Sequence, residues 1–262
     1  MKPRSYDIIG SREKAVAIVE IPDKFKNKEK EIAEEILNRH KNVKSVLKKL
    51  SKREGVFRTR EYQLLLGDKN TEVIHIEHGC RLKLDPQKVY FSSREGTERL
   101  RISGIVKPKE TILVMFAGIG PYSVMIAKKQ SKVKKIISIE INPIAVEYMK
   151  ENIRLNRVGD RIIPILGDVK EECKDWFGKC DRVIMPLPQD ACKFLYSAFK
   201  CLKSRGTIHL YIIEKEENVK QRAKKISYSL EKKTKKKISY RINKVLPYAP
   251  RVNKYCIDLK LS

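Results

Sequence analysis

From about residue 97 onward, short apolar runs alternate with longer segments whose apolar residues recur every three or four positions. The short runs predict buried strands, and the three-to-four spacing predicts amphipathic helices. This alternation is typical of a parallel sheet with helices on both faces. Two later runs, 240–246 and 254–262, predict an antiparallel pair of strands at one edge. The other expected strands are 111–116, 135–140, 162–166, 181–185 and 206–213, and the expected helices are 120–130, 143–155, 189–202 and 216–228.

The first 93 residues follow a different pattern. Residues 5–21 alternate between apolar and polar positions around a glycine, which predicts a hairpin. Residues 26–50 predict a helix, because their apolar residues fall at helical spacing. Three further runs, within 56–66, 72–79 and 81–93, predict strands separated by turns. We therefore expect a small α+β domain over 1–93 and an α/β domain over 94–262. The apolar positions that support the helix are Ile32, Ile36, Leu37, Val43, Val46, Leu47 and Leu50.

The charge balance is strongly basic. The chain has 58 lysines and arginines against 32 acids, a net charge of +26. Such a charge attracts polyanions, and nucleic-acid backbones are the most common of these in cells. A lysine-rich proteome from a hot environment is the alternative, but there acids and lysines rise together. The excess of bases favours a nucleic-acid partner. The basic stretch 231–240 is interpreted as a solvated turn region rather than a localisation signal.

The cysteines and the apolar runs bear on metal binding and on the location of the protein in the cell. None of the six cysteines forms a Cys-x-x-Cys pair, and only four histidines accompany them, so no metal site is expected. Scattered thiols fit a reducing cytosol. No apolar run is long enough to span a bilayer, and the N-terminus lacks the apolar core of a signal peptide. We expect a cytoplasmic protein without membrane contact.

The segment "TILVMFAGIGPYSVMIA" at 111–127 places two glycines, Gly118 and Gly120, between a strand and a helix. A Gly-x-Gly pair alone could be only a tight turn. Glu140 lies 20 residues after Gly120, at the end of the next strand, where a carboxylate usually binds ribose hydroxyls.

The same loop fits a dinucleotide poorly. Ser123 stands where the third glycine of the fingerprint belongs, and Pro121 removes a backbone donor that a pyrophosphate would need. A P-loop is excluded as well, because no Gly-Lys-Ser/Thr follows. A ligand with a ribose but no phosphate agrees with both observations, and S-adenosylmethionine is such a ligand.

Two segments after later strands extend this site. Asp168, in "LGDVKEE", could accept a hydrogen bond from the adenine amino group, and it could equally cap the next helix. The segment "DRVIMPLPQDACKFL" follows the fourth strand, where methyltransferases of this architecture place residues that face the substrate. The predicted cofactor-binding residues are Phe116, Ala117, Gly118, Gly120, Tyr122, Glu140, Ile141, Asp168, Pro186 and Leu187.

These segments together resemble one family, the archaeal and eukaryotic tRNA (guanine37-N1)-methyltransferases. The resemblance rests on "YFSSREGTERLRI", "VMFAGIGPYS", "SIEINPIAVEYMKENIRLN", "IPILGD", "DRVIMPLPQDACKFL" and "YAPRVNKYCIDLKL", and so spans nearly the whole chain. It implies a class I, Rossmann-like methyltransferase domain preceded by a smaller α+β domain that contacts RNA. It also implies a tRNA partner, bound through its anticodon loop at position 37. We expect a monomer. The additional N-terminal module that some members carry is expected to be absent.

The resemblance also implies catalytic roles. Glu98 matches the general base of the family, and Arg58 its base-contacting arginine, while Arg99 and Pro186 fall beside them in the matching motifs. A carboxylate can take the proton that guanine N1 loses on methylation, and a guanidinium can stabilise the charge that develops on O6. Without the resemblance, Glu98 would be interpreted as an ordinary acid in a first helical turn. Arg60, two residues from Arg58, is an alternative base contact.

Two departures from the family pattern affect the prediction. Pro186-Leu187-Pro188 replaces the usual Asn-Leu-Pro and resembles the wyosine-type bifunctional branch, whose members also methylate C7 of 4-demethylwyosine. Val114 stands where an acid usually helps to hold the methionine amino group. A 4-demethylwyosine aminocarboxypropyltransferase and a catalytically inactive RNA-binding relative remain the alternatives.

Overall fold

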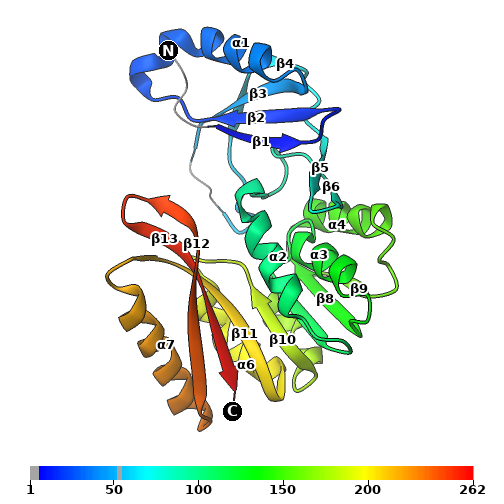
Figure 1. Cartoon of the computed structure of the whole chain (residues 1–262), viewed down its shortest axis with the longest axis vertical. Coiled ribbons are helices and arrows are strands. Elements are labelled where there is room, and N and C mark those ends of the chain that lie inside the picture. Colours follow the sequence, from blue (N-terminus) through cyan, green and yellow to red (C-terminus); the bar gives the residue numbers. More distant parts are fainter. Residues whose placement is uncertain (1–5, 52–54, 262) are drawn as a thin grey trace.

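A computed structural model describes residues 6–51 and 55–261 of the chain. Figure 1 shows a small N-terminal layer above a larger α/β unit. In the described part, seven strands of the larger unit form one sheet in the order β12-β13-β11-β10-β7-β8-β9. Neighbouring strands from β9 to β11 run parallel, and β13 is antiparallel to both β11 and β12. The strands are β7 (Thr111–Met115), β8 (Lys135–Glu140), β9 (Ile162–Leu166), β10 (Cys180–Met185), β11 (Leu202–Lys215), β12 (Ile238–Ala249) and β13 (Val252–Leu261).

Helices cover both faces of this sheet because its central strands are apolar on both sides. In β7, Ile112 and Val114 are buried in one core and Leu113 and Met115 in another. The first core includes residues of α2, α3 and α4, and the second includes residues of α5, α6 and α7. The fold class predicted from the sequence is confirmed. The helices are α2 (Gly96–Ile105), α3 (Pro121–Lys129), α4 (Pro143–Leu155), α5 (Val169–Glu172), α6 (Leu195–Cys201) and α7 (Val219–Thr234).

The described part of the N-terminal layer is a four-stranded sheet with one α-helix, which follows a 3-10 turn at Asp23–Lys28. Its order is β1-β2-β3-β4, and α1 connects the parallel pair β2–β3. The predicted hairpin is confirmed as β1–β2, which pair antiparallel. The elements are β1 (Tyr6–Gly10), β2 (Ala15–Val19), α1 (Glu29–Arg39), β3 (Val43–Lys49) and β4 (Tyr62–Gly67).

The helix predicted over 26–50 is wrong beyond Arg39. Residues 43–49 form β3 instead, paired with β2 and β4. The register of β2–β3 shifts between Val43 and Ser45, so an extra residue is accommodated there. This irregularity lets Val43 and Val46 share one core although they are three positions apart, which imitates helical spacing. Strand pairing overrides the local pattern.

Other boundaries differ from the expected ones. The strand predicted over 56–66 begins only at Tyr62, the strand at 81–93 ends at Leu84, and α7 continues to Thr234. None of the helices within residues 6–51 and 55–261 is long and apolar enough to cross a lipid bilayer.

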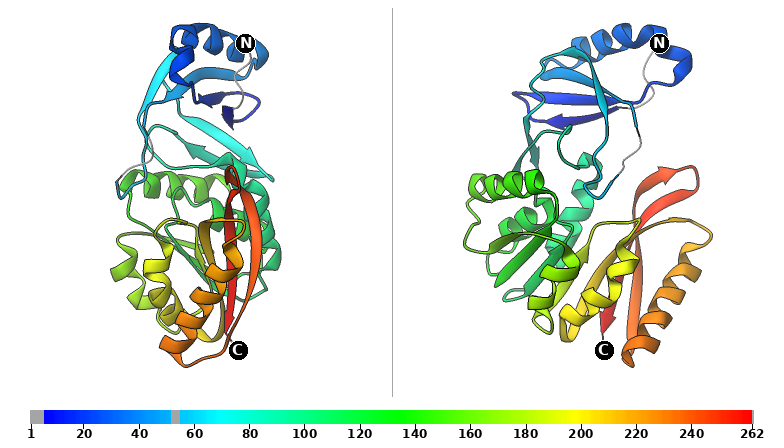
Figure 2. Two further views of the ribbon diagram at one scale, coloured as in Figure 1. Left: turned by 90° about the vertical axis from the view of Figure 1, so that its left-hand side faces the viewer. Right: turned by 180° about the vertical axis from the view of Figure 1, so that it is seen from behind.

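The hairpin β5 (Val73–Glu77) and β6 (Cys80–Leu84) connects the two layers, as the views in Figure 2 show. Asn152 of α4 accepts from the Lys83 amide at 2.6 Å and donates to the Lys83 carbonyl at 3.2 Å. Asn156 makes the same pair of contacts with Arg81. The side-chain amides of Asn152 and Asn156 thus attach the hairpin to the larger α/β unit. The domain boundary expected near residue 93 stays a prediction.

Candidate functional site

The strand order reverses at β7. The chain proceeds from β7 outward to β8 and β9, and then returns to β10 on the other side of β7. Ligands of open α/β sheets bind at the carboxyl ends of the strands on either side of such a reversal. Segments that leave β7, β8, β9 and β10 at this edge therefore define the candidate site.

The two glycines of the loop after β7 have different surroundings and therefore different structural roles. Gly118 has a φ of +56°, and a Cβ added there would come no closer to any atom than 3.9 Å, from the Tyr90 carbonyl oxygen. Gly120 has a φ of +79°, and a Cβ there would lie only 2.8 Å from Cγ of Met149. Gly118 leaves an open backbone face for a ligand, whereas Gly120 allows α3 and α4 to pack closely.

The Glu140 carboxylate, at the end of β8, is fixed by backbone amides. The Gly118 amide donates to Oε2 at 2.7 Å, and the Asn142 amide donates to Oε1 at 2.9 Å. Burial raises the pKa of the Glu140 carboxyl, although these amides favour the charged form. Each oxygen retains a lone pair for a ribose hydroxyl, so the residues present fit the predicted cofactor.

Asp168 caps a helix, as one of its two expected roles requires. It is exposed, and its side chain accepts from the Lys170 amide at 2.9 Å at the start of α5. One carboxylate oxygen remains available for an amino group. Phe116 packs edge-on against Phe194, with ring centres 5.0 Å apart. Ala117 donates its amide to the Ile139 carbonyl at 2.9 Å, which ties the loop to β8 beside Ile141.

Tyr122 lies in the first turn of α3, and its side chain is buried. Its ring packs against that of Tyr211, with centres 6.0 Å apart. Its hydroxyl meets no hydrogen-bond partner among the described residues. Val114 is fully buried in the same core and brings no polar group to the site.

Glu98 lies in the first turn of α2 and is 6% exposed. The Arg101 guanidinium donates to both oxygens, from Nη2 to Oε1 and from Nε to Oε2, each at 2.7 Å. The Tyr211 hydroxyl donates to Oε1 at 2.6 Å. Oε1 therefore accepts two donors and Oε2 one, which leaves Oε2 as the oxygen that can accept a further proton donor.

Arg99, the next residue, has different contacts. It is 2% exposed and makes a bidentate ion pair with Glu77, at 2.7 Å from Nε and 2.5 Å from Nη2. It also donates to the Ser92 carbonyl at 2.8 Å. These contacts bind α2 to hairpin β5–β6. They are the contacts of a structural ion pair.

Arg58 approaches the site from the N-terminal layer. Its Nη1 donates to Oε1 of Gln189, the residue that follows Pro186-Leu187-Pro188. The proline turn is held by the Leu187 amide, which donates to the Met185 carbonyl at 2.9 Å. The segment before β4 and the loop after β10 therefore meet, although 131 positions separate Arg58 from Gln189. Arg60 lies nearby in sequence, and its buried Nε has no hydrogen-bond partner among the described residues.

A buried polar chain continues from Glu98 to the middle of the sheet. Arg101 also donates to Asp258, at 3.1 Å. Asp258 accepts from His209 Nδ1 at 2.6 Å, and Arg182 donates to His209 Nε2 at 2.6 Å. Because a guanidinium only donates, His209 must carry its proton on Nδ1 and is neutral. Burial also lowers the pKa of His209, which favours the same neutral form.

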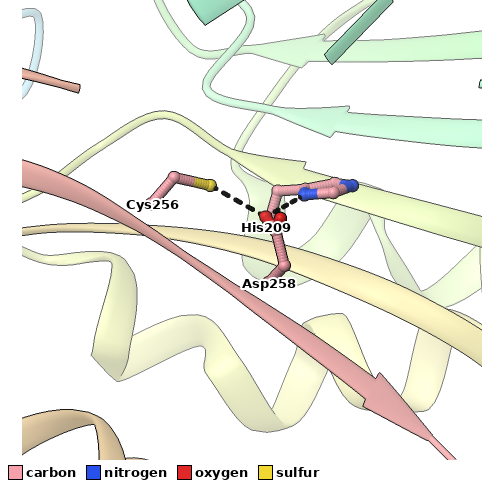
Figure 3. A group of neighbouring side chains, drawn as sticks. All are labelled: His209, Cys256 and Asp258. Carbon is pink, nitrogen blue, oxygen red and sulfur yellow. Dashed lines mark hydrogen bonds and ion pairs between the residues drawn. The ribbon is translucent and has the colours of Figure 1, made fainter. Parts of the chain in front are cut away.

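His209, Cys256 and Asp258 form the cluster drawn in Figure 3, with ligand atoms within 4.8 Å of one another. The Cys256 thiol donates to Asp258 at 3.2 Å. Two guanidinium groups, from Arg101 and Arg182, already bind this cluster, and a divalent cation would be repelled by both. The geometry is that of a hydrogen-bonded network rather than of a metal centre.

Two family comparisons agree with this geometry. Residues 73–242 match the family model of the TRM5/TYW2 methyltransferase domain, and residues 1–71 match that of the TYW2 N-terminal domain. The chain belongs to the TRM5/TYW2 methyltransferase family. The family resemblance found in the sequence is thereby confirmed.

Individual relatives of the TRM5/TYW2 family cover most of the chain. The tRNA (guanine(37)-N(1))-methyltransferase Trm5b of Pyrococcus abyssi is 42% identical, over 99% of this chain and 76% of that protein. A tRNA(Phe) (4-demethylwyosine(37)-C(7)) aminocarboxypropyltransferase of Methanocaldococcus jannaschii is 39% identical, over 87% and 90%. The tRNA (guanine(37)-N(1))/4-demethylwyosine(37)-methyltransferase Taw22 of Nanoarchaeum equitans is 33% identical, over 85% and 88%.

Two solved structures of relatives contain ligands. A complex of aTrm5 with tRNALeu superposes with a TM-score of 0.85 at 37% identity, over 100% of this chain and 73% of that chain. TYW2 of M. jannaschii in complex with AdoMet gives a TM-score of 0.75 at 31% identity, over 98% and 99%. The TRM5/TYW2 fold therefore extends across both layers of this chain.

Residues that the sequence analysis did not select complete the site in this family member. Tyr211 and Gln189 contact Glu98 and Arg58 from distant parts of the chain, and Arg101 contacts Glu98 from the next turn of α2. One signal was available: His209 and Asp258 each interrupt a short, mainly apolar run, 208–213 in β11 and 255–259 in β13. A buried polar residue in such a strand requires a partner.

Proposed function

We propose that the chain is an S-adenosylmethionine-dependent tRNA methyltransferase that acts on N1 of guanine-37. The Pyrococcus Trm5b relative supports the substrate and the reaction. The relatives bound to AdoMet and to tRNALeu support the cofactor and the partner.

The observation that carries the proposal is the fixed Glu140 carboxylate beside the open face of Gly118. Amides of Gly118 and Asn142 orient the carboxylate without occupying all of its lone pairs. A ribose can therefore be bound with two hydroxyls, and the loop offers no amide cradle for a pyrophosphate because Pro121 opens α3. S-adenosylmethionine, when bound, supplies an electrophilic methyl group.

Glu98 is the proposed general base. The proton on guanine N1 must leave as the nitrogen attacks the methyl carbon, and a carboxylate within hydrogen-bond reach can accept it. Arg101 and Tyr211 hold Glu98 in one orientation with its Oε2 partly open. These two residues are positioning residues, because they act through Glu98.

Arg58 is the proposed contact for guanine O6, where negative charge develops during the reaction. Its contact with Gln189 supports a location near the proline turn after β10. We propose no catalytic role for Arg99, since Glu77 and Ser92 bind its guanidinium. Pro186 lacks a polar side chain and can only shape the pocket wall.

Methylation at C7 of 4-demethylwyosine is the second proposed activity. The Taw22 relative carries both activities in its name, and it covers most of this chain. Pro186-Leu187-Pro188 replaces an amide by an apolar ring at the place where the base is expected. An apolar wall accommodates a larger tricyclic base more readily than an unpaired amide does.

Nucleoside mass spectrometry tests these proposals. The full chain is incubated with S-adenosylmethionine and with unmodified or 4-demethylwyosine-containing tRNA. We expect a methyl group on guanine-37 of the first, and one on the tricyclic base of the second. Transfer of the aminocarboxypropyl group instead would favour the activity of the Methanocaldococcus relative and overturn the proposal. No detectable cofactor binding by calorimetry at millimolar concentration would favour an inactive RNA-binding relative. The expected cytoplasmic location and monomeric state stay predictions.

A further inference from the structure

Helix α7 and the turn after it carry an unusual concentration of positive charge. Residues 219–241 contain ten lysines and arginines against a single acid, Glu231. All ten cationic residues are exposed. They are Lys220, Arg222, Lys224, Lys225, Lys232, Lys233, Lys235, Lys236, Lys237 and Arg241, and we call this surface the α7 basic face.

The α7 basic face differs from an ordinary solvated helix surface. Among the described residues, no carboxylate lies within 4.0 Å of any of its ten cations. On other helices, several cations pair with acids one turn away, such as Lys30 with Glu34 and Lys150 with Glu147. Glu231 instead accepts from the Ile238 amide at 2.7 Å. Ten cations that no acid neutralises repel one another, and a polyanion would relieve that repulsion.

The apolar side of α7 is already occupied. Val219, Ala223, Ile226 and Leu230 are buried in the core beneath the helix. A basic helix that binds a membrane surface inserts its apolar side into the lipid, and α7 has no such side to offer. The exposed charge of this helix is therefore suited to bind a hydrated polyanion rather than a lipid surface.

Aromatic groups lie among the cations. Tyr228 is 65% exposed in the middle of the basic face, and Tyr240 is 39% exposed on β12. Tyr228 borders a shallow hollow of about 780 Å³ whose other walls include Lys232, Lys235, Lys236 and Lys237. Cations interleaved with exposed aromatic rings are the surface chemistry that nucleic acids select.

The α7 basic face reaches well beyond the candidate site. The chain leaves the carboxyl end of β11 at Lys215 and enters α7. The helix then runs back towards the end of the sheet where the parallel strands begin (Figures 1 and 2). Sixteen helical residues span about 24 Å. Phosphates bound at the C-terminal turns of α7 therefore lie at the end of the sheet opposite to the candidate site (Figure 1).

We infer that the α7 basic face is a second RNA-binding surface, which binds the phosphate backbone of tRNA outside the anticodon loop. This inference rests on the proposed function, because it places the target nucleotide at the carboxyl edge of the sheet. It assigns to α7 the recognition of the tRNA body by charge rather than by sequence.

A charge-matched pair of variants tests the inference. The first combines Lys224→Glu, Lys225→Glu and Lys232→Glu on α7. The second combines Lys107→Glu, Lys132→Glu and Lys134→Glu, three exposed lysines at the amino ends of β7 and β8 that have no acid within 4.0 Å among the described residues. Both change the net charge equally. Binding of full tRNA and of an isolated anticodon stem-loop is measured between 50 and 300 mM salt, with thermal unfolding as a control for folding.

We expect the α7 variant to lose about tenfold or more in affinity for full tRNA, with a salt dependence lower by about three counterions. The matched variant and all stem-loop affinities should change much less. Equal effects of the two variants on full tRNA would overturn the inference, as would binding of wild type to anionic phosphatidylserine vesicles in preference to tRNA. If the α7 variant unfolds, the same positions changed to Gln repeat the test. Failure of methylation at guanine-37 would overturn the proposed function but would leave this comparison of affinities intact.

Discussion

The Tyr211 hydroxyl donates to Oε1 of Glu98 at 2.6 Å, which joins β11 to the first turn of α2 across 113 positions of the sequence. Both side chains are buried, and Arg101 donates to the same oxygen. The proposed base is thus held by two donors on one oxygen and by one donor on the other.

Glu98→Gln should lower the single-turnover methylation rate about a hundredfold or more, because the amide cannot accept the N1 proton. Tyr211→Phe should reduce the same rate by a smaller factor, because Glu98 remains but loses one donor that orients it. Tyr148→Phe is the matched control, because it also removes a hydroxyl that donates to a carboxylate, Oε2 of Glu72 at 2.8 Å, and it should leave the rate unchanged. Cofactor affinity, measured in parallel, should be near wild type in all three. An unaltered rate in Glu98→Gln excludes the base role.

Glu140 makes cofactor affinity depend on pH. Burial raises the pKa of this carboxyl above its ordinary value, and only the anion accepts hydrogen bonds from both ribose hydroxyls. Affinity for S-adenosylmethionine should therefore be highest at neutral pH, where Glu140 is ionised, and should decline as the pH falls through the raised pKa. Calorimetry between pH 7.5 and 4.5 measures the decline. Glu140→Gln should bind more weakly at pH 7.5 and show a flatter profile; a wild-type profile in that variant would remove Glu140 from the cofactor site.

The sequence predicted the part of the site that is local in the chain. A strand, two glycines, a proline at the start of a helix and an acid at the next strand end are all set by neighbouring residues, and the structure has them in the predicted elements. It could not predict that Tyr211 faces Glu98 or that Arg58 meets Gln189, because these contacts depend on how distant elements pack. The helix predicted over 26–50 failed for a related reason: an irregular strand and a helix can share the same apolar spacing.

Alanine substitutions at Gly118 and Gly120 should have different effects: the first mainly on cofactor binding, and the second mainly on stability. Both have positive φ, so alanine at either costs about 1 kcal/mol in backbone strain. At Gly120 the new methyl also meets the fully buried Met149 at 2.8 Å, which should add about 1–3 kcal/mol. Gly118→Ala should weaken cofactor binding more than tenfold with a modest loss of stability, and Gly120→Ala should mainly lower the free energy of unfolding. Urea denaturation and calorimetry on both variants check this; equal cofactor affinity in Gly118→Ala and wild type would mean that the open face does not receive the ligand.

His209 should make stability fall in mild acid. Burial lowers its pKa, so the folded chain resists a proton that the unfolded chain binds below about pH 6.5. The contribution is fully present above that pH and is lost as the pH falls. His75, whose pKa burial also lowers, acts in the same direction, whereas the lowered pKa of Asp258 takes effect only in stronger acid.

The variant His209→Asn tests this contribution. It should lower the free energy of unfolding at pH 8 by about 1–3 kcal/mol, because the Arg182 contact is lost, and it should flatten the dependence between pH 7 and 5. His78→Asn is the matched control: His78 is exposed with a φ of 48°, a conformation that asparagine tolerates, and its pH dependence should follow wild type. Urea titrations at pH 8, 7, 6 and 5 give the four curves. Parallel slopes for His209→Asn and wild type would show that this histidine does not couple folding to protons.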